Sequence, residues 1–472
     1  MIKQLKLALI ISKREIRDQF RDWRIIFPIM GLTIFFPFLM NFTTAQVLQF
    51  VNRYGASIIG ERMVPFSMMI VGFFPISVSL VIALESFVGE KERGSIEPLF
   101  NTPLEDWQIY IGKLISSIVP PLFASFIGIT VFSLGLIIND VPLPEFSLVL
   151  QIFILTIVQA IVMVTGAVVV SSQATSVKAA NLLASFIIIP MALLIQGESI
   201  VMFWGDYLTL WWVVIGLTVL AILLMRIGLA HFNREELLGK EIDVLNFKWG
   251  WRVFKTNFLG EAKNLWSWYR KEIFYTIKEL RFSILAVVGI SIISFFIGAN
   301  QITRFSLPLD EIGVGDMENQ LKNLSSSWSV GNFSPVFAIF LQNIRVILLS
   351  FVLGVISLGI FGTIPIIASI SLVGYIMALL QQIGLSASTY IIGFILPHGL
   401  FEISAAIIST AALLHMGILL AIPNKAMTIG EVWIVSIAKW VKVLVGIVIP
   451  MIFIGSIIES WITPKLALWL LF

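Results

Sequence analysis

Long apolar segments alternate with short polar ones along most of the chain. Six apolar segments precede the first long polar interval, at about residues 25–42, 65–84, 109–138, 147–170, 181–196 and 207–229. A second block contains five more, at about residues 282–299, 343–362, 364–381, 389–422 and 443–459. A membrane-spanning helix needs about 20 mostly apolar residues. The pattern therefore predicts an all-α polytopic membrane protein with about 11 transmembrane helices.

The N-terminal segment that precedes the first apolar segment is amphipathic. Its apolar residues recur at spacings of three, four or multiples of these, with Lys and Arg on the other faces. These apolar residues are Ile2, Leu5, Leu9, Ile16, Phe20 and Trp23. The pattern predicts an interfacial helix in the inner leaflet. A cytosolic helix packed on a partner protein is the alternative.

The apolar segment 389–422 is too long for one ordinary span, and Pro397, His398 and Gly399 interrupt it. Proline removes a backbone donor, and irregular backbone at membrane depth is tolerated where protein surrounds it. We therefore expect a re-entrant or broken helix near residues 389–402, followed by a full span.

Composition supports the membrane assignment and excludes several other classes. Hydrophobic residues make up 58% of the 472 positions and charged residues 12%, about half the charged share of a soluble protein. The net charge is only +3, and the basic residues lie beside apolar segments, which excludes a nucleic-acid-binding protein. Cysteine is absent, so disulfides, thiolate metal sites and cysteine nucleophiles are excluded.

The distribution of basic residues predicts the orientation of the chain in a cell membrane. Of its 31 Lys and Arg residues, 22 lie in the N-terminal segment, in residues 85–113, in residues 171–180 or in residues 226–281. The intervening loops are neutral or acidic, and we assign Glu198 and Asp206 to one of them. Cytoplasmic loops carry the excess of basic residues, so the N-terminus is predicted to be cytoplasmic. The acidic loop 300–342 is placed outside.

A basic and aromatic interval separates the two apolar blocks. Such a composition beside membrane spans is typical of a segment on anionic lipid, and we favour membrane lipids over nucleic acid as its contact. No internal repeat relates the two blocks. We therefore predict three regions: a six-helix membrane domain at 1–230, a cytoplasmic interfacial linker at 231–281 and a second membrane domain at 282–472.

The loop after the second apolar segment, residues 85–107, concentrates charge on the predicted cytoplasmic face. Gly89 and Gly94 bracket a run of alternating charges. Thr102-Pro103-Leu104-Glu105 fits a capping box with proline at the first helical position, so a helix is predicted to start there and continue into the third span. A short helix held between two turns could transmit a push from a soluble partner, whereas an ordinary solvated loop is the alternative.

The run ESFVGEKERGSIEPLFNTPLEDWQIYIGKL in this region resembles the cytoplasmic loop and following helix of membrane subunits of type-2 ABC transporters. The resemblance covers residues 1–230. It implies a permease that docks onto a separate ATPase through this loop. The residues implied to lie near that contact are Glu90, Lys91, Glu92, Arg93, Gly94 and Glu97. The chain has no GxxxxGK[ST] phosphate loop, so ATP and Mg²⁺ are expected on the partner, not in this chain.

The second block contains two of the three histidines, His398 and His415. His398 and Glu402 are four residues apart and would share one face of a helix. Ionisable residues inside a membrane are costly and often functional. A metal site, a proton or ion path, and a buried structural hydrogen bond are the three interpretations. We favour the hydrogen bond and predict no metal, because metal sites usually need three or four ligands.

The element Leu396-Pro397-His398-Gly399-Leu400-Phe401-Glu402 resembles the signature of the stage II sporulation protein M family, together with residues spaced before it. Those residues are Asn343, Gly354, Gly359 and Gly374. The resemblance covers residues 280–460 and implies a family motif that includes Asn343, Gly354, Gly359, Pro397, His398, Gly399 and Glu402. The family is linked to membrane and cell-wall remodelling. Glycines in this block let helices approach closely.

Together these features predict the membrane subunit of an ATP-driven exporter, not an enzyme. We expect a homodimer with two ATPase subunits, because the second block is no copy of the first, and a lipid-like or amphipathic cargo, because the spans hold few charges. The alternative is a non-transporting scaffold for remodelling of the cell envelope. An intramembrane hydrolase that uses His398 and Glu402 lacks an accompanying nucleophile or HExxH pattern.

Overall fold

The computed structural model describes most of the chain, at residues 2–54, 57–174, 176–205, 207–232, 234, 246–303, 322–323, 326, 328, 330–382, 386–422 and 427–471. Of the described residues 89% are helical, and none of them lies in a strand. Among them are 11 helical stretches long and apolar enough to cross a membrane. The predicted all-α polytopic membrane fold is thereby confirmed. The acidic residues of the predicted outer loop, from Asp310 to Glu318, and Asp206 lie outside the described residues.

The chain divides into two compact units, residues 1–245 with 421–424 and residues 246–420 with 425–472. Residues 246–281, which the sequence analysis assigns to a linker, fold with the second unit. The helices of the first unit are α1 (Ile2–Gln19), α2 (Trp23–Tyr54), α3 (Ser57–Glu92), α4 (Ile96–Phe100), α5 (Asp106–Ile138), α6 (Phe146–Gln173), α7 (Val177–Leu183), α8 (Ser185–Trp204) and α9 (Thr209–His231).

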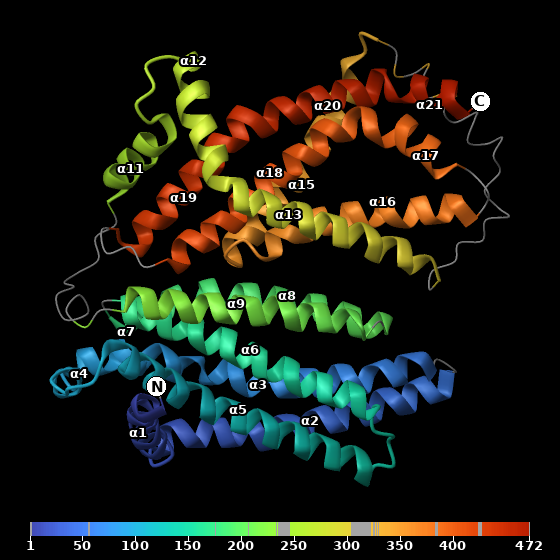
Figure 1. Cartoon of the computed structure of the whole chain (residues 1–472). Coiled ribbons are helices and arrows are strands. Elements are labelled where there is room, and N and C mark those ends of the chain that lie inside the picture. Colours follow the sequence, from blue (N-terminus) through green and yellow to red (C-terminus); the bar gives the residue numbers. More distant parts are fainter. Residues whose placement is uncertain are drawn as a thin grey trace. The chain divides into compact units, whose positions relative to one another are not determined.

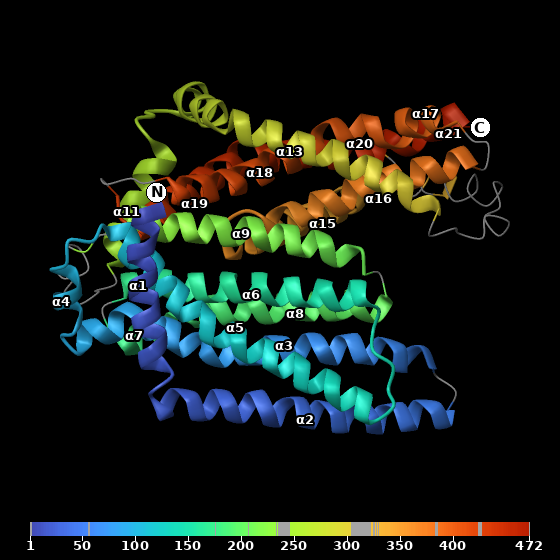
Figure 2. The same ribbon diagram turned by 60° about the horizontal axis from the view of Figure 1, so that its bottom comes forward.

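Helix α6 forms the centre of the first unit. Of the residues in an 18-residue apolar stretch of α6, 72% are buried, whereas the corresponding share is 17% for α2 at the edge. Helix α3 packs against both α5 and α6, and α9 covers another side of α6. The long helices run side by side, and the short α4 and α7 lie at one end of them (Figures 1 and 2).

Helix α1 runs across the long helices of its unit (Figure 2). It packs on α5 through Ala8, Ile11 and Ser12, which are all buried, and the Ser12 hydroxyl donates a hydrogen bond of 2.8 Å to the Gly112 carbonyl. Leu7, Leu9 and Ile10 of α1 stay exposed, and so do Phe20 and Trp23, which follow the helix. A small buried face toward α5 and bulky exposed apolar residues suit a helix at the lipid interface.

The second unit begins with α11 (Phe247–Leu259), α12 (Leu265–Ser267) and the π-helical turn η1 (Trp268–Ile273). Its further elements are α13 (Phe274–Asn300), the 3-10 turn η2 (Gln301–Thr303), α15 (Phe333–Ile356), the 3-10 turn η4 (Phe361–Thr363), α16 (Ile364–Gln382), α17 (Ala387–Tyr390), the π-helical turn η5 (Ile391–Ile395), α18 (Leu396–Ala421), α19 (Ile429–Val443), the π-helical turn η6 (Leu444–Val448), α20 (Ile449–Trp461) and α21 (Thr463–Leu471).

Two of the π-helical turns precede prolines at the same spacing. Pro397 follows Gly393 of η5 by four residues, and Pro450 follows Gly446 of η6 by four residues. A proline inside a helix leaves the carbonyl four residues earlier without its donor, and a π-helical turn accommodates this with a wider ring. The interruption expected near residues 389–402 is therefore a π-helical turn in one continuous helical stretch from Ala387 to Ala421, and that stretch contains no re-entrant loop.

Small residues bring α13 and α16 of the second unit close together. A Cβ built on Gly298 would meet the backbone of Ser371, and one built on Gly374 would meet the backbone of Phe295. The Ser371 hydroxyl also donates to the Ser294 carbonyl at 2.9 Å. Helices in membranes associate largely through such close packing, because no hydrophobic effect drives them together in lipid.

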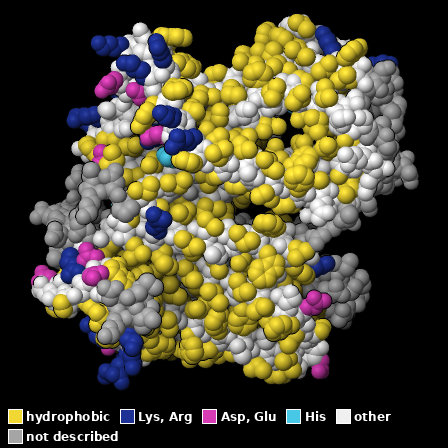
Figure 3. Space-filling model, in the orientation of Figure 1, with side chains coloured by type: hydrophobic (Ala, Val, Ile, Leu, Met, Phe, Trp, Pro, Cys, Tyr) yellow, Lys and Arg dark blue, Asp and Glu magenta, His cyan; other side chains and the backbone are white. Residues whose placement is uncertain are grey.

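Exposed side chains on the long helices of each unit are mainly apolar, whereas Lys and Arg lie mostly toward the helix ends (Figure 3). In the second unit, Lys439 and Lys442 of α19 pair with Glu279 and Glu272 at 2.8 and 2.9 Å. Helix α11, in the predicted interfacial region, exposes Phe247 and Trp251. This distribution is typical of a protein whose flanks face lipid.

Candidate functional site

The charged loop after α3 is an ordered corner with a short helix. Gly94, with a φ of +69°, ends α3 and turns the chain into α4, whose Ile96, Leu99 and Phe100 are buried while Glu97 is exposed. The predicted short helix between two turns is therefore present. Helix α4 lies at the end of the long helices of its unit (Figure 1), and its exposed residues are Glu97 and Pro98.

The predicted capping box at Thr102 to Glu105 is wrong by three residues. The Thr102 hydroxyl donates to the Leu99 carbonyl at 2.6 Å and so belongs to the end of α4. Glu105 is the N-cap of α5, and its backbone N–H donates to Gln108 Oε1 at 2.9 Å. Glu105 and Gln108 are three residues apart, as are Thr102 and Glu105, the predicted pair. The capping box is therefore formed by the later pair, and α5 begins at Asp106.

The structure separates the six predicted coupling residues into two groups. Glu90 turns inward to Lys113, and a Glu92 oxygen accepts a hydrogen bond of 2.8 Å from the Val177 backbone N–H at the start of α7. Glu92, Arg93, Gly94 and Glu97 are exposed, and Lys91 is half-buried. The exposed charged side chains of the set are thus Glu92, which also bonds α7, Arg93 and Glu97, whereas Glu90 holds the corner in place.

Lys113 lies at the centre of an ion-pair network that joins three helices. Its ammonium group, 1% exposed, lies 2.8 Å from Glu90 of α3 and 3.6 Å from Glu15 of α1. It also lies 5.3 Å from the ring centroid of Phe87. Sequence analysis counted Lys113 only as a basic residue that orients the chain. Its place inside the apolar segment 109–138 was the signal of a buried, paired role.

Arg234, which follows α9, fixes the corner from the other side. Its guanidinium donates to the Asp106 carboxylate at 2.5 Å, to the Phe100 carbonyl at 2.9 Å and to the Leu104 carbonyl. It therefore bonds both the end of α4 and the residue that precedes the N-cap of α5. Arginine has five N–H donors in a planar fork, which a lysine does not reproduce.

Replacing Arg234 with Lys is expected to loosen α4 and the turn after it. Two carbonyl acceptors lose their charged donor, and each such bond contributes about 1.5–3 kcal/mol. Amides that are bonded within the corner, such as Asn101 N–H to Glu97 O, should exchange at least roughly tenfold faster. Hydrogen–deuterium exchange of peptides from residues 96–104 measures this. Arg226→Lys, at an exposed position of α9, is the matched control and should leave exchange unchanged.

Glu198 is a buried carboxylate of the first unit, not the loop residue that the sequence analysis expected. It lies in α8, is 1% exposed, and accepts a hydrogen bond of 2.7 Å from Gln159 Nε2 of α6. Its other oxygen, Oε1, is buried without a hydrogen-bond partner. The glycine and serine beside it resemble a loop in composition, but the partner amide allows the helix to continue through Glu198.

The Pro-His-Gly element lies beside two further polar side chains in the second unit. His398, Glu402 and Glu459 place one ligand-type atom each within 4.8 Å of the others. The Asn343 side chain of α15 hydrogen-bonds Glu402. His398 and Glu402 come from α18, whereas Glu459 comes from α20. Glu459 was missed by sequence analysis, although only three acidic residues follow Glu318 in the sequence.

The other motif residues serve packing. A Cβ on Gly354 would lie 3.0 Å from the Leu413 side chain, and Gly359 has a φ of +92° beside the Leu413 backbone. Pro397 follows the π-helical turn η5. Gly399 is buried in α18 with Ile395 and Ile403 of its own helix nearby. The motif therefore combines a polar cluster with sites of close helix contact.

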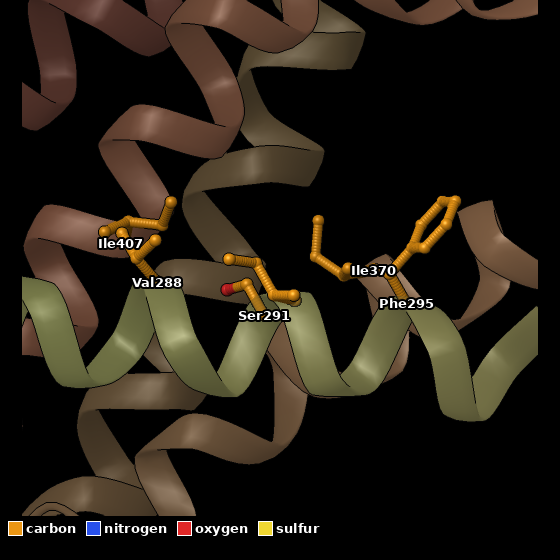
Figure 4. Close-up of a pocket in the computed structure, with 6 residues that line it drawn as sticks. Val288, Ser291, Phe295, Ile370 and Ile407 are labelled. Carbon is orange, nitrogen blue, oxygen red and sulfur yellow. The ribbon is translucent and has the colours of Figure 1, made fainter.

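Cavities lie between the helices of the second unit. A groove of about 300 Å³ is lined by side chains of α13, α16 and α18, among them Val288, Phe295 and Ile407 (Figure 4). Its only polar side chain is Ser291, so it offers no titratable chemistry. A second cavity of about 150 Å³ is lined by apolar side chains together with the polar residues Asn343, Glu402, Ser350, Ser369 and Thr410. This smaller cavity reaches the polar cluster.

Eleven apolar helices within the described ranges, in two compact units, define a multi-pass membrane protein with two helical modules. Comparison with known families identifies both modules. Residues 9–209 match the ABC-2 family transporter protein, and residues 282–464 match stage II sporulation protein M. The chain is therefore an ABC-2 permease domain fused to a stage II sporulation protein M domain, which confirms both predicted resemblances.

The chain also resembles a curated archaeal protein, the uncharacterized protein MJ0706 of Methanocaldococcus jannaschii. The two are 27% identical over 193 residues, which cover 40% of this chain and 84% of the relative. No solved structure matches the chain. The ABC-2 match over residues 9–209 supports a transporter membrane subunit.

Proposed function

We propose that the protein is the membrane subunit of an ATP-driven exporter and that a separate ATPase drives it through the loop 85–107. The observation that carries the proposal is the corner itself. Helix α4 is anchored by three apolar side chains and by Arg234, the Glu90–Lys113 pair joins α3 to α5 beside it, and the corner exposes Arg93 and Glu97. A rigid corner with charged exposed residues suits the transmission of force from a soluble partner to α3 and α5.

The proposed assembly is a homodimer with two ATPase subunits, which hold the ATP and Mg²⁺. The N-terminus and the corner lie on the cytoplasmic side of the cell membrane in this proposal, in agreement with the basic residues of α1 and of residues 85–113. A lipid-like or amphipathic cargo is favoured, because the exposed surfaces of the spans are mainly apolar (Figure 3). Native mass spectrometry of the complex tests the two-to-two stoichiometry.

The test of the proposal is purification of the protein from its native cells, followed by measurement of the retained ATPase activity. Glu97→Lys or Arg93→Glu should lower the retained activity at least roughly tenfold, because like charges brought together across an interface cost several kcal/mol. Glu145→Lys is the matched control, since Glu145 is exposed in the loop after α5, away from α4. It should leave the activity unchanged.

A wild-type protein that retains no ATPase, or variants that retain as much as the wild type, would contradict the coupling role. The alternative, a scaffold for envelope remodelling, predicts that outcome. Glu90 is excluded from this test because its loss would disturb the Lys113 network as well as a docking surface.

A further inference from the structure

We propose that His398, Glu402 and Glu459 form a binding site for a divalent transition-metal ion of the Zn²⁺ type in the second unit. The three side chains supply an imidazole nitrogen and two carboxylates, with ligand-type atoms within 4.8 Å of one another. Zinc binds His and Glu at about 2.0–2.2 Å, so atoms around one ion lie about 3–4 Å apart. Small side-chain movements would therefore close the present arrangement around a cation.

Charge balance within the apolar helices favours a divalent ion. Glu402 and Glu459 lie side by side in this cluster, and neither is on the exposed surface. Two adjacent carboxylates in a poorly hydrated site cannot both keep their charge without a counter-charge. One divalent cation neutralises both. The described residues place no Lys or Arg ion pair at this cluster, in contrast to Glu272 and Glu279.

The hydrogen bonds of His398 suit a metal ligand. The Thr463 hydroxyl lies 3.3 Å from His398 Nδ1 and itself donates to the Ile458 carbonyl. The hydroxyl oxygen is therefore left to accept, which places the imidazole proton on Nδ1 and leaves the Nε2 lone pair available. Metal-binding histidines characteristically donate their other ring N–H to such a partner. The Thr463 contact thus prepares His398 as a neutral ligand.

Glu402 has an oxygen that the protein leaves available. Its Oε1 is buried without a hydrogen-bond partner, although Asn343 bonds the side chain. Gly455 of α20 makes the space for this carboxylate, because a Cβ there would lie 3.0 Å from Oε1. The cavity of about 150 Å³ that reaches Asn343 and Glu402 gives room for a water molecule or another ligand as the fourth partner of the ion.

A π-helical turn precedes each of the two helices, α18 and α20, that carry His398, Glu402 and Glu459. His398 is the third residue after η5, and Glu459 lies in the helix that follows η6. Such turns are frequent at functional sites, because each inserts an extra residue and rotates the helix that follows. The earlier expectation of no metal rested on two candidate ligands, whereas the fold brings Glu459 to them as a third.

The test is Zn²⁺ binding by the full-length protein in detergent, purified with a tag that contains no histidine and treated with a chelator. The wild type should bind one Zn²⁺ per chain in titration calorimetry, and the metal should raise its thermal unfolding midpoint. Glu459→Gln and His398→Gln should weaken binding more than about 100-fold, since each removes a ligand. His415→Gln, which changes the other histidine of α18, should bind as the wild type does.

Two further variants keep the proposal testable if a ligand variant fails to fold. Thr463→Val should weaken Zn²⁺ binding about 10–100-fold through loss of the hydrogen bond to His398. Gly455→Ala should weaken it by displacing Glu402. A chelated wild type that binds no Zn²⁺ and no Mn²⁺ would overturn the proposal and assign the cluster to a proton shared by the two carboxylates. Equal binding by the wild type and Glu459→Gln would overturn it as well.

Discussion

Replacing Lys113 with Met is expected to destabilise the first unit by about 3–5 kcal/mol, because it removes one partner of a buried ion-pair network. Methionine keeps the apolar stem of the side chain but removes the cation paired with Glu90, whose side chain is 17% exposed, and leaves Glu15, which is 16% exposed, paired with Arg14. For a unit of this size the unfolding midpoint should fall by roughly 10 °C. Intrinsic tryptophan fluorescence during heating in detergent measures the change.

Arg14→Met provides a matched control for the Lys113 variant. Arg14 pairs with the same Glu15 at 2.9 Å, but its side chain is 60% exposed, so its loss should shift the midpoint little. Adding Glu90→Gln to Lys113→Met should restore part of the lost stability, because the unpaired carboxylate is then neutral. If Lys113→Met melted as the wild type does, Lys113 would have no structural role in holding α1, α3 and α5 together.

The sequence predicted the helices well because each apolar run is long enough to span a bilayer on its own. It also identified His398 and Glu402, which are four residues apart on one helix, and the short helix after Gly94. These features depend on local spacing. The spacing of Gly393 and Pro397, repeated at Gly446 and Pro450, is equally local and could have predicted both π-helical turns.

Pairings between distant residues could not be predicted in this way. Glu198 reads as a loop residue until Gln159, 39 residues earlier, supplies its hydrogen bond. In the sequence, Lys113 is one of the basic residues that orient the chain, whereas in the structure it is paired with Glu90 and Glu15. In the sequence, Glu459 is an acidic residue at the end of an apolar segment, whereas the fold places it beside Glu402. In each case a polar residue in an apolar helix is tolerated because a partner from another helix satisfies it, and that partner is set by tertiary packing.

Tertiary packing also explains the expected destabilisation by substitutions of the glycines between α13 and α16. Replacing Gly298 with Ala should destabilise the second unit by about 1–3 kcal/mol, because the added methyl group would overlap the Ser371 backbone of α16. The two helices must then separate, and the contact between Ser371 and the Ser294 carbonyl weakens with them. The thermal midpoint in detergent should fall by several degrees.

Gly289→Ala on the same helix distinguishes close packing from a general effect of alanine. A Cβ at Gly289 meets nothing within 4 Å, so this variant should melt at the wild-type temperature or slightly above it. Gly374→Ala, on the facing helix, should resemble Gly298→Ala. The double variant should lose less than the sum of the two, because helices already forced apart have room for the second methyl group. Strict additivity, or equal losses for Gly289→Ala and Gly298→Ala, would show that close contact between α13 and α16 does not hold this unit together.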